Sequence, residues 1–252
     1  MDLYAFTMIM IAGISTGLGA TPIYFKREYS TNFLDLGLGF SAGVMLIAAF
    51  SALIFPSVNL VNFIYKSQFG IFVPVLGLII GYQAVIYLHK HIPHEHLLQK
   101  INLDSLKNSK YYLIFIAMCL HNIPEGLSVG IGFGGTSFAN ALYIGIAISI
   151  QNLPEGLVVA LGVVKAGESR NKAFLLAFLS GIIEPIAAFI GFYATTISKL
   201  TLPFALAFAG GAMLFVVCQE MLPELFNKKD ISSSQKGILL GFIIMILIIN
   251  FI

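Results

Sequence analysis

Charge is scarce in this sequence. Only 10% of its 252 residues are Asp, Glu, Lys or Arg, tryptophan is absent, and there are two cysteines. A soluble domain usually carries about 25% charged residues, so this composition argues against a soluble protein. No polar stretch is long enough for a separate soluble domain, and the net charge of +2 does not indicate a nucleic-acid partner.

Hydrophobic residues fill the chain instead, at 58%, and the mean hydropathy is +0.91. Apolar runs long enough to cross a bilayer recur from end to end, which predicts an all-α integral membrane protein whose surroundings are lipid. We expect one transmembrane domain over residues 1–252, with eight transmembrane helices. The predicted spans cover about 3–25, 33–55, 70–88, 111–133, 138–162, 172–196, 202–225 and 236–252.

The lysines and arginines predict the orientation. Twelve of the fourteen fall in the loops after spans 1, 3, 5 and 7, while the opposite side has only Lys66 and Lys199. Because basic loops stay in the cytoplasm, we expect a multi-pass protein of the plasma membrane with both termini on the extracytoplasmic side. The start of the chain lacks the basic region of a signal peptide, so span 1 is expected to be retained.

Four acids behave differently from the basic residues. Glu125, Glu155, Glu184 and Glu220 fall inside predicted spans, where the chain offers no Lys or Arg at their depth. An ionised carboxylate in a low-dielectric site needs a partner. Either these glutamates are protonated, or their partner is a cation that is not part of the chain. Both readings make them candidate functional residues.

The glutamates belong to a repeated motif, HNIPEG at 121–126 and QNLPEG at 151–156. In each copy the first residue and the glutamate are four positions apart, which places them on one helix face. Helix rise places both motifs and Glu184 roughly 10–21 Å inside their spans, at one level of the membrane. Pro124, Pro154 and Pro185 each free a backbone carbonyl at this level, as in the broken helices of transporter sites.

The donor atoms narrow the choice of cation. Imidazole nitrogen with carboxylate and amide oxygens suits Zn²⁺ or similar divalent ions, whereas Cu⁺ prefers sulfur. Cys119 lies two residues from His121, so it points to another face, and with Cys218 it is expected to be a packing residue. Neutral amides are weak ligands, which suits an ion that must leave again.

The doubled motif resembles the signature of the ZIP (ZRT/IRT-like) metal transporters, and its glutamine-bearing second copy is similar to their bacterial-type branch. The resemblance covers nearly the whole chain. It implies a divalent metal transporter, not an enzyme, with zinc, iron, manganese or cadmium as its substrate, and a homodimer. Many members have His where Gln151 stands, and some have Asp where Asn152 stands.

The resemblance also implies a binuclear metal centre between spans 4, 5 and 6. One ion would be held by a first set of ligands and the second by another, with the two motif glutamates bridging. The first set is His121, Glu125, Gln151 and Glu155, and the second is Asn122, Glu125, Asn152, Glu155 and Glu184.

Spans 2 and 7 share the pattern F-x-x-G-x-M-L, from Phe40 and from Phe208. Because these spans cross the membrane in opposite directions, the pattern predicts an inverted repeat of spans 1–3 and 6–8 around spans 4–5, a 3+2+3 arrangement. The alignment pairs Ala52 with Glu220. Glu220 is then either an exit station for the ion, on the cytoplasmic side of the central site, or an acid that reaches the membrane interface. An exit there predicts transport into the cytoplasm.

Two other functions remain open at this stage. The glutamates would also suit a proton-coupled carrier of another solute, and H-x-x-x-E could hold zinc in an intramembrane metalloenzyme. The sequence lacks H-E-x-x-H and an evident general base, which disfavours the enzyme. The segment His89–His96 holds four of the five histidines, and it is either a metal-collecting loop or a solvated, pH-sensitive one.

Overall fold

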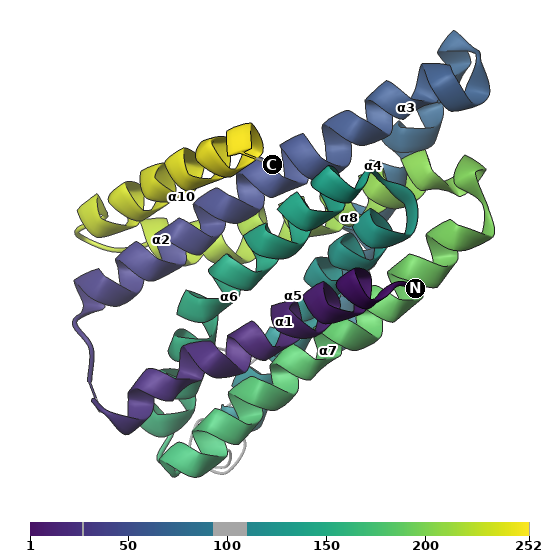
Figure 1. The fold of residues 1–252 in the computed structure, drawn as a ribbon. Coiled ribbons are helices and arrows are strands. Elements are labelled where there is room, and N and C mark those ends of the chain that lie inside the picture. The colour runs from purple at the N-terminus through teal and green to yellow at the C-terminus, as the bar shows by residue number, and fades with distance from the viewer. Residues whose placement is uncertain (27, 93–109, 252) are drawn as a thin grey trace.

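A computed structural model describes residues 1–26, 28–92 and 110–251. Its regular elements are helical throughout the described ranges, as Figure 1 shows. In chain order they are α1 (Leu3–Ala20), η1 (Thr21–Tyr24), α2 (Thr31–Ala48), η2 (Ala49–Ile54), α3 (Phe55–Tyr65), η3 (Gln68–Ile71), α4 (Phe72–His91), α5 (Lys110–Gly135), α6 (Phe138–Lys165), α7 (Arg170–Ile197), η6 (Lys199–Thr201), α8 (Leu202–Val216), η7 (Val217–Met221), α9 (Leu222–Phe226) and α10 (Ser232–Phe251).

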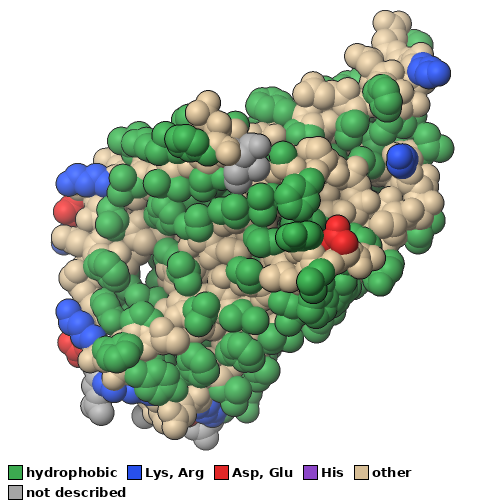
Figure 2. Space-filling view, in the orientation of Figure 1, with side chains coloured by type: hydrophobic (Ala, Val, Ile, Leu, Met, Phe, Trp, Pro, Cys, Tyr) green, Lys and Arg blue, Asp and Glu red, His purple; other side chains and the backbone are tan. Residues whose placement is uncertain are grey.

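Eight helical segments of the described chain are long and apolar enough to cross a membrane, which confirms the predicted all-α membrane class. Figure 2 shows hydrophobic side chains along the length of the visible face and Lys and Arg side chains towards its two ends. That distribution is the one expected of a bundle lying across a bilayer.

The largest difference from the expected spans is in the second. It runs from Thr31 to Tyr65, ten residues beyond the predicted end, and its last part protrudes past the other helices in Figure 1. Pro56 lies in the first turn of α3, where its missing N–H is tolerated, so it begins a helix there instead of ending the span. The third span reaches His91, which moves His89 and His91 from the expected loop into α4.

The helices pack in two groups. In the first, α1, α5, α6 and α7 contact one another, and in the second α2 packs on α10 and α4 packs on α8. Glycines allow the closest approaches in the second group, since a Cβ on Gly43 would lie 2.4 Å from the carbonyl oxygen of Ile238. The groups meet mainly where α2 contacts α6 and α5 contacts α8.

Spans 2 and 7 share an uncommon backbone feature. Each contains a π-helical segment, η2 in span 2 and η7 in span 7, inserted between two α-helical parts. Each π segment is followed by a proline in the first turn of the next helix, at Pro56 and Pro223. π segments inside α-helices occur frequently at functional sites, and here one of them contains Glu220.

Candidate metal centre

The two motif helices and α7 bring their polar residues together inside the first group. All seven predicted metal ligands are buried, with between 0% and 8% of their surface exposed. One ligand atom each from His121, Glu125 and Glu155 lies within 4.8 Å of the other two. These three residues come from α5 and α6, so the structure juxtaposes the two copies of the motif.

The motif glycines allow this packing. A Cβ on Gly126, at the end of HNIPEG, would lie 2.2 Å from the carbonyl oxygen of Glu184 on α7. A Cβ on Gly156, at the end of QNLPEG, would lie 1.9 Å from the carbonyl oxygen of Thr16 on α1. Both distances are shorter than a side chain tolerates, so glycine is required if α7 and α1 are to approach the motif glutamates.

The motif prolines do not break their helices. α5, α6 and α7 run without interruption through Pro124, Pro154 and Pro185, unlike the broken helices of many transporter sites. The carbonyl that Pro185 leaves without its helical N–H belongs to Gly181. This oxygen faces α1, since a Cβ on Gly13 would lie 2.6 Å from it. Pro185 therefore lies where α7 packs closely on α1.

Hydrogen bonds hold the predicted amide ligands in place. Gln151 donates through Nε2 to Glu125 Oε1 at 2.8 Å. Asn152 donates through Nδ2 to Glu184 Oε1 at 2.8 Å, and Asn122 donates to the carbonyl oxygen of Ser180 at 2.7 Å. Each amide thus uses its N–H₂ group for the protein, which orients its carbonyl oxygen towards other partners.

The remaining acceptor atoms have no donor within the described part of the chain. Buried polar atoms normally find a hydrogen-bond partner, and a cluster without them calls for an explanation. The eight atoms are His121 Nε2, Asn122 Oδ1, Glu125 Oε2, Gln151 Oε1, Asn152 Oδ1, Glu155 Oε1, Glu155 Oε2 and Glu184 Oε2. They come from the seven residues that the sequence singled out, and all of them are of the kinds that bind divalent metal ions.

The cluster is acidic, and its countercharge does not come from basic side chains. Among the described residues, the ion pairs of Lys and Arg with acids are Lys172 with Glu168 and Lys228 with Asp35, and neither pair involves a motif glutamate. An acidic cluster of this kind suits a small cation as its partner.

A second group of side chains leads away from the cluster on one side. Nδ1 of His121 lies 3.3 Å from Oε2 of Glu220, whose Oε1 lies 2.7 Å from Nε2 of His89. The Glu220 side chain is 18% exposed, whereas that of Glu125 is fully buried. The central cluster therefore approaches solvent through Glu220, beside the end of α4 at His91.

Sequence reasoning did not find three residues of this region. Thr16 donates to Glu184 Oε1 at 3.1 Å, and Ser41 donates to the carbonyl oxygen of Gln151 at 2.7 Å. His89 was placed in a loop. A search for Ser and Thr inside the predicted spans would have identified Thr16 and Ser41. Ending span 3 three residues later would have placed His89 in a helix. His94 and His96 lie outside the described residues.

Comparison with known proteins identifies the family of the chain. A family model described as ZIP zinc transporter matches residues 87–249. The zinc transporter GufA of Myxococcus xanthus is 34% identical over 95% of each chain. The zinc transporters ZupT of Chlorobaculum parvum and of Streptococcus mutans are 31% and 32% identical, each over 96% of this chain and 95% and 94% of their own lengths. The chain belongs to the ZIP zinc transporter family.

Proposed function

We propose that this protein carries a divalent metal cation, zinc in the first place, across the plasma membrane into the cytoplasm. The relatives are named as zinc transporters, and the family is one of transporters and not of enzymes. The observation that carries the proposal is the set of eight buried acceptor atoms without donors, gathered from three helices. Iron, manganese and cadmium accept the same donor types, so a competition assay has to rank them.

The central site holds the ion in two overlapping ligand sets. His121, Glu125, Gln151 and Glu155 form the first set, and the hydrogen bond from Gln151 to Glu125 ties it together. The second set combines Asn122, Asn152 and Glu184 with the two motif glutamates. Weak amide ligands allow the ion to leave, as transport requires.

Glu220 is the exit station in this proposal. It contacts His121 of the central set on one side and His89 on the other, and it is more exposed than the motif glutamates. The loops on this side hold most of the basic residues, which supports a cytoplasmic exit and extracytoplasmic termini. An ion released from His121 would therefore reach the cytoplasm. We also propose that the protein works as a homodimer.

Metal binding to the purified protein tests the central claim. We expect the wild type to bind about one or two zinc ions per chain, because two overlapping sets of hard and borderline ligands are present. Glu125→Ala combined with Glu155→Ala should abolish this binding, since both sets lose their shared carboxylates. The gentler pair Glu125→Gln and Glu155→Gln keeps the side-chain volume and should give the same loss.

Glu168→Ala is the matched control, because Glu168 pairs with Lys172 away from the site. This variant should keep the wild-type stoichiometry. Unchanged zinc stoichiometry in both double variants would show that the site is elsewhere. Direct binding also separates this proposal from a proton-coupled carrier of another solute. Flux only from the cytoplasmic face outward, in oriented proteoliposomes with an internal metal-sensitive dye, would overturn the direction.

A further inference from the structure

A groove, here called the α1–α2 groove, lies between the two groups of helices on the side of the membrane where α1 ends and α2 begins. Its volume is about 460 Å³, which is within the range of binding pockets for small molecules. Figure 2 shows an opening in the surface between these parts of α1 and α2. Residues of α1, α2, α6 and α10 line the groove, among them Leu18, Phe33, Phe40, Leu153, Pro154 and Leu240.

Glycines let α6 form the bottom of this groove. A Cβ on Gly19 of α1 would lie 2.1 Å from the carbonyl oxygen of Leu153, and a Cβ on Gly37 of α2 would lie 3.1 Å from Cβ of Pro154. α1 and α2 therefore both pack closely on α6, and the trough lies between them. The lining consists of apolar residues. Since the surroundings of the spans are hydrocarbon, an acyl chain is the occupant whose chemistry matches this lining.

The depth of the groove also suits a lipid. Phe33 is the third residue of α2, so this end of the groove is near the membrane surface. Phe40 lies seven residues further along α2, which corresponds to about 10 Å of helix. The groove thus extends inwards from the level at which lipid headgroups lie.

Two lysines stand at the end of the groove that is near the membrane surface. The Tyr29 ring stacks on Phe33 with 5.5 Å between the ring centroids, and the Lys26 ammonium lies 5.3 Å from the centroid of the Tyr29 ring. Lys236 is four residues before Leu240 on α10, so it lies on the same helix face, one turn nearer the surface. Both lysines are exposed, and neither forms an ion pair with an acid of the described chain.

We infer that the α1–α2 groove binds an anionic phospholipid, with an acyl chain in the groove and the phosphate headgroup beside Lys26 and Lys236. Lysines near a membrane surface attract anionic headgroups, and the long lysine side chain allows the ammonium to reach that level from within a span. The apolar lining and the two unpaired cations thus match the two ends of one molecule.

The inference depends on the membrane class of the protein and not on the proposed metal transport. The predicted metal ligands do not line the groove, although Leu153 and Pro154 lie between Asn152 and Glu155 on α6. A bound acyl chain would therefore touch the motif helix on its lipid side. Zinc stoichiometry and lipid preference can fail independently of each other.

Tryptophan fluorescence tests the site, because the chain has no tryptophan of its own. Leu240→Trp places a reporter in the groove, and Leu179→Trp is the matched control on α7. The two leucines are 44% and 42% exposed, and they lie eight and nine residues after the starts of their helices, on the same side of the membrane. Each variant is reconstituted in phosphatidylcholine, phosphatidylglycerol and their mixtures, with one of the two lipids brominated in its acyl chains so that it quenches tryptophan.

At Leu240→Trp, the quenching should show a preference for phosphatidylglycerol over phosphatidylcholine of about fivefold or more, since each lysine near the surface favours an anionic lipid by about that factor. At Leu179→Trp the two lipids should quench about equally. Equal quenching by the two lipids at Leu240→Trp, or the same preference at both positions, would overturn the inference. Quenching of Leu240→Trp by neither lipid would overturn it too, because no acyl chain would then lie in the groove.

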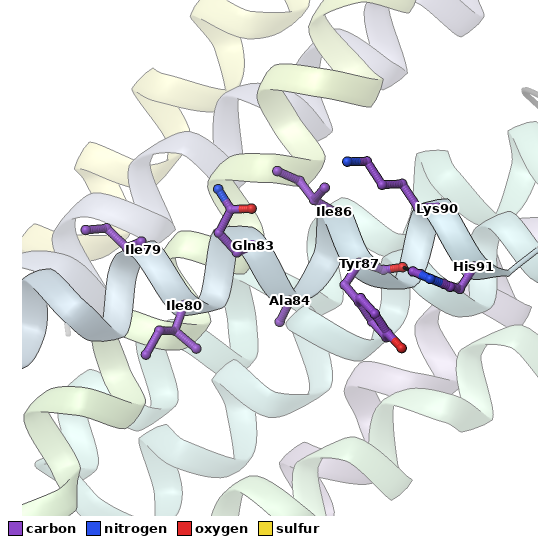
Figure 3. A pocket seen from close by; sticks show the side chains of 8 residues that line it. All are labelled: Ile79, Ile80, Gln83, Ala84, Ile86, Tyr87, Lys90 and His91. Carbon is purple, nitrogen blue, oxygen red and sulfur yellow. Dashed lines mark hydrogen bonds between the residues drawn. The ribbon is translucent and has the colours of Figure 1, made fainter.

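The role of the lysines is tested in the Leu240→Trp background. Lys26→Gln combined with Lys236→Gln should remove the preference for phosphatidylglycerol while quenching by phosphatidylcholine persists. Lys90→Gln is the matched control, because Lys90 lies at the end of α4 on the same side of the membrane, beside a separate groove along that helix (Figure 3). This variant should keep the preference. An undiminished preference in the double lysine variant would overturn the assignment of the headgroup.

Discussion

The two π-helical segments have the same backbone form and opposite chemistry. Each begins nine residues after the start of the shared pattern, η2 after Phe40 and η7 after Phe208. At corresponding positions η2 has Ala52, which is fully buried in the hydrophobic core, and η7 has Glu220, which contacts two histidines. Side chains, and not the backbone, therefore make the two π segments different.

The difference indicates which side of the molecule is closed. The core around Ala52 contains small and aliphatic residues such as Ala49, Leu53 and Leu206, all with at most 1% of their surface exposed. One polar side chain reaches this position, since Asn140 donates to the carbonyl oxygen of Ala52 at 3.2 Å. Around Glu220 the neighbours are polar and the side chain reaches solvent. Apolar packing excludes a hydrated ion, so we propose that the predicted metal centre is reached from the Glu220 side and is closed on the Ala52 side.

The largest effect is expected when Ala52 is replaced by the glutamate that stands at the corresponding position of η7. Ala52→Glu introduces a carboxyl group into a site with no solvent and no basic partner, and it should destabilise the protein by about 3–5 kcal/mol. For a chain of this size we expect the unfolding temperature to fall by about 10 °C. Thermal unfolding in detergent measures the effect.

The reciprocal change is the control. Glu220→Ala removes a partly exposed side chain and should move the unfolding temperature only slightly. Ala52→Glu unfolding at the wild-type temperature would mean that the region around Ala52 is hydrated and that the seal does not exist.

The second prediction sharpens the role of Glu220. Glu220→Gln keeps the shape of the side chain but removes the charge between His121 and His89. If an ion passes this point, zinc flux into oriented proteoliposomes should fall about tenfold or more, while zinc stoichiometry at the central site stays the same. Glu220→Asp should recover part of the flux. Wild-type flux in Glu220→Gln would reduce Glu220 to an acid at the interface.

The sequence was sufficient for the class of fold and for the choice of candidate ligands. Hydropathy identifies the spans because lipid imposes the same requirement on every one of them. The candidate ligands could be proposed because polar residues such as Gln151 and Asn152 stand out in apolar surroundings. Both signals are local in the sequence.

What could not be predicted depends on helix packing. The bond from Thr16 to Glu184 joins residues 168 positions apart, and the α1 backbone reaches that level only because Gly13, Gly156 and Gly181 lack side chains. His89 was missed for a different reason, since the end of a helix is uncertain by several residues in any hydropathy profile. Because α4 continues to His91, His89 lies in the helix and contacts Glu220 instead of lying in a solvated loop.

The packing order is informative about the predicted repeat. In the second group span 2 packs on span 8, and span 7 packs on span 3. In the predicted repeat, spans 1, 2 and 3 correspond to spans 6, 7 and 8. Exchanging the two halves therefore converts the first pair into the second. The same exchange turns the contact of α1 with α6 into that of α7 with α5. This symmetry and the two π segments support an inverted repeat of spans 1–3 and 6–8, which stays an interpretation.

The smallest expected effect concerns the centre, where the two motif helices meet. Gln151 is fully buried, donates to Glu125 and leaves its carbonyl oxygen without a donor among the described residues. Replacing this neutral oxygen by an imidazole nitrogen gives the first ligand set a second histidine beside His121. Because Zn²⁺ binds imidazole more strongly than an amide, Gln151→His should lower the zinc Kd by about tenfold.

Tighter binding should come with slower release, so zinc flux should fall in the same variant. Calorimetry gives the Kd, and Gln235→His, an added histidine on the exposed start of α10, controls for adventitious binding. Unchanged or weaker zinc affinity in Gln151→His would place Gln151 outside the ligand set. A lower Kd with undiminished flux would instead show that release is not limited by the strength of this ligand, and would move the slow step to the path through Glu220.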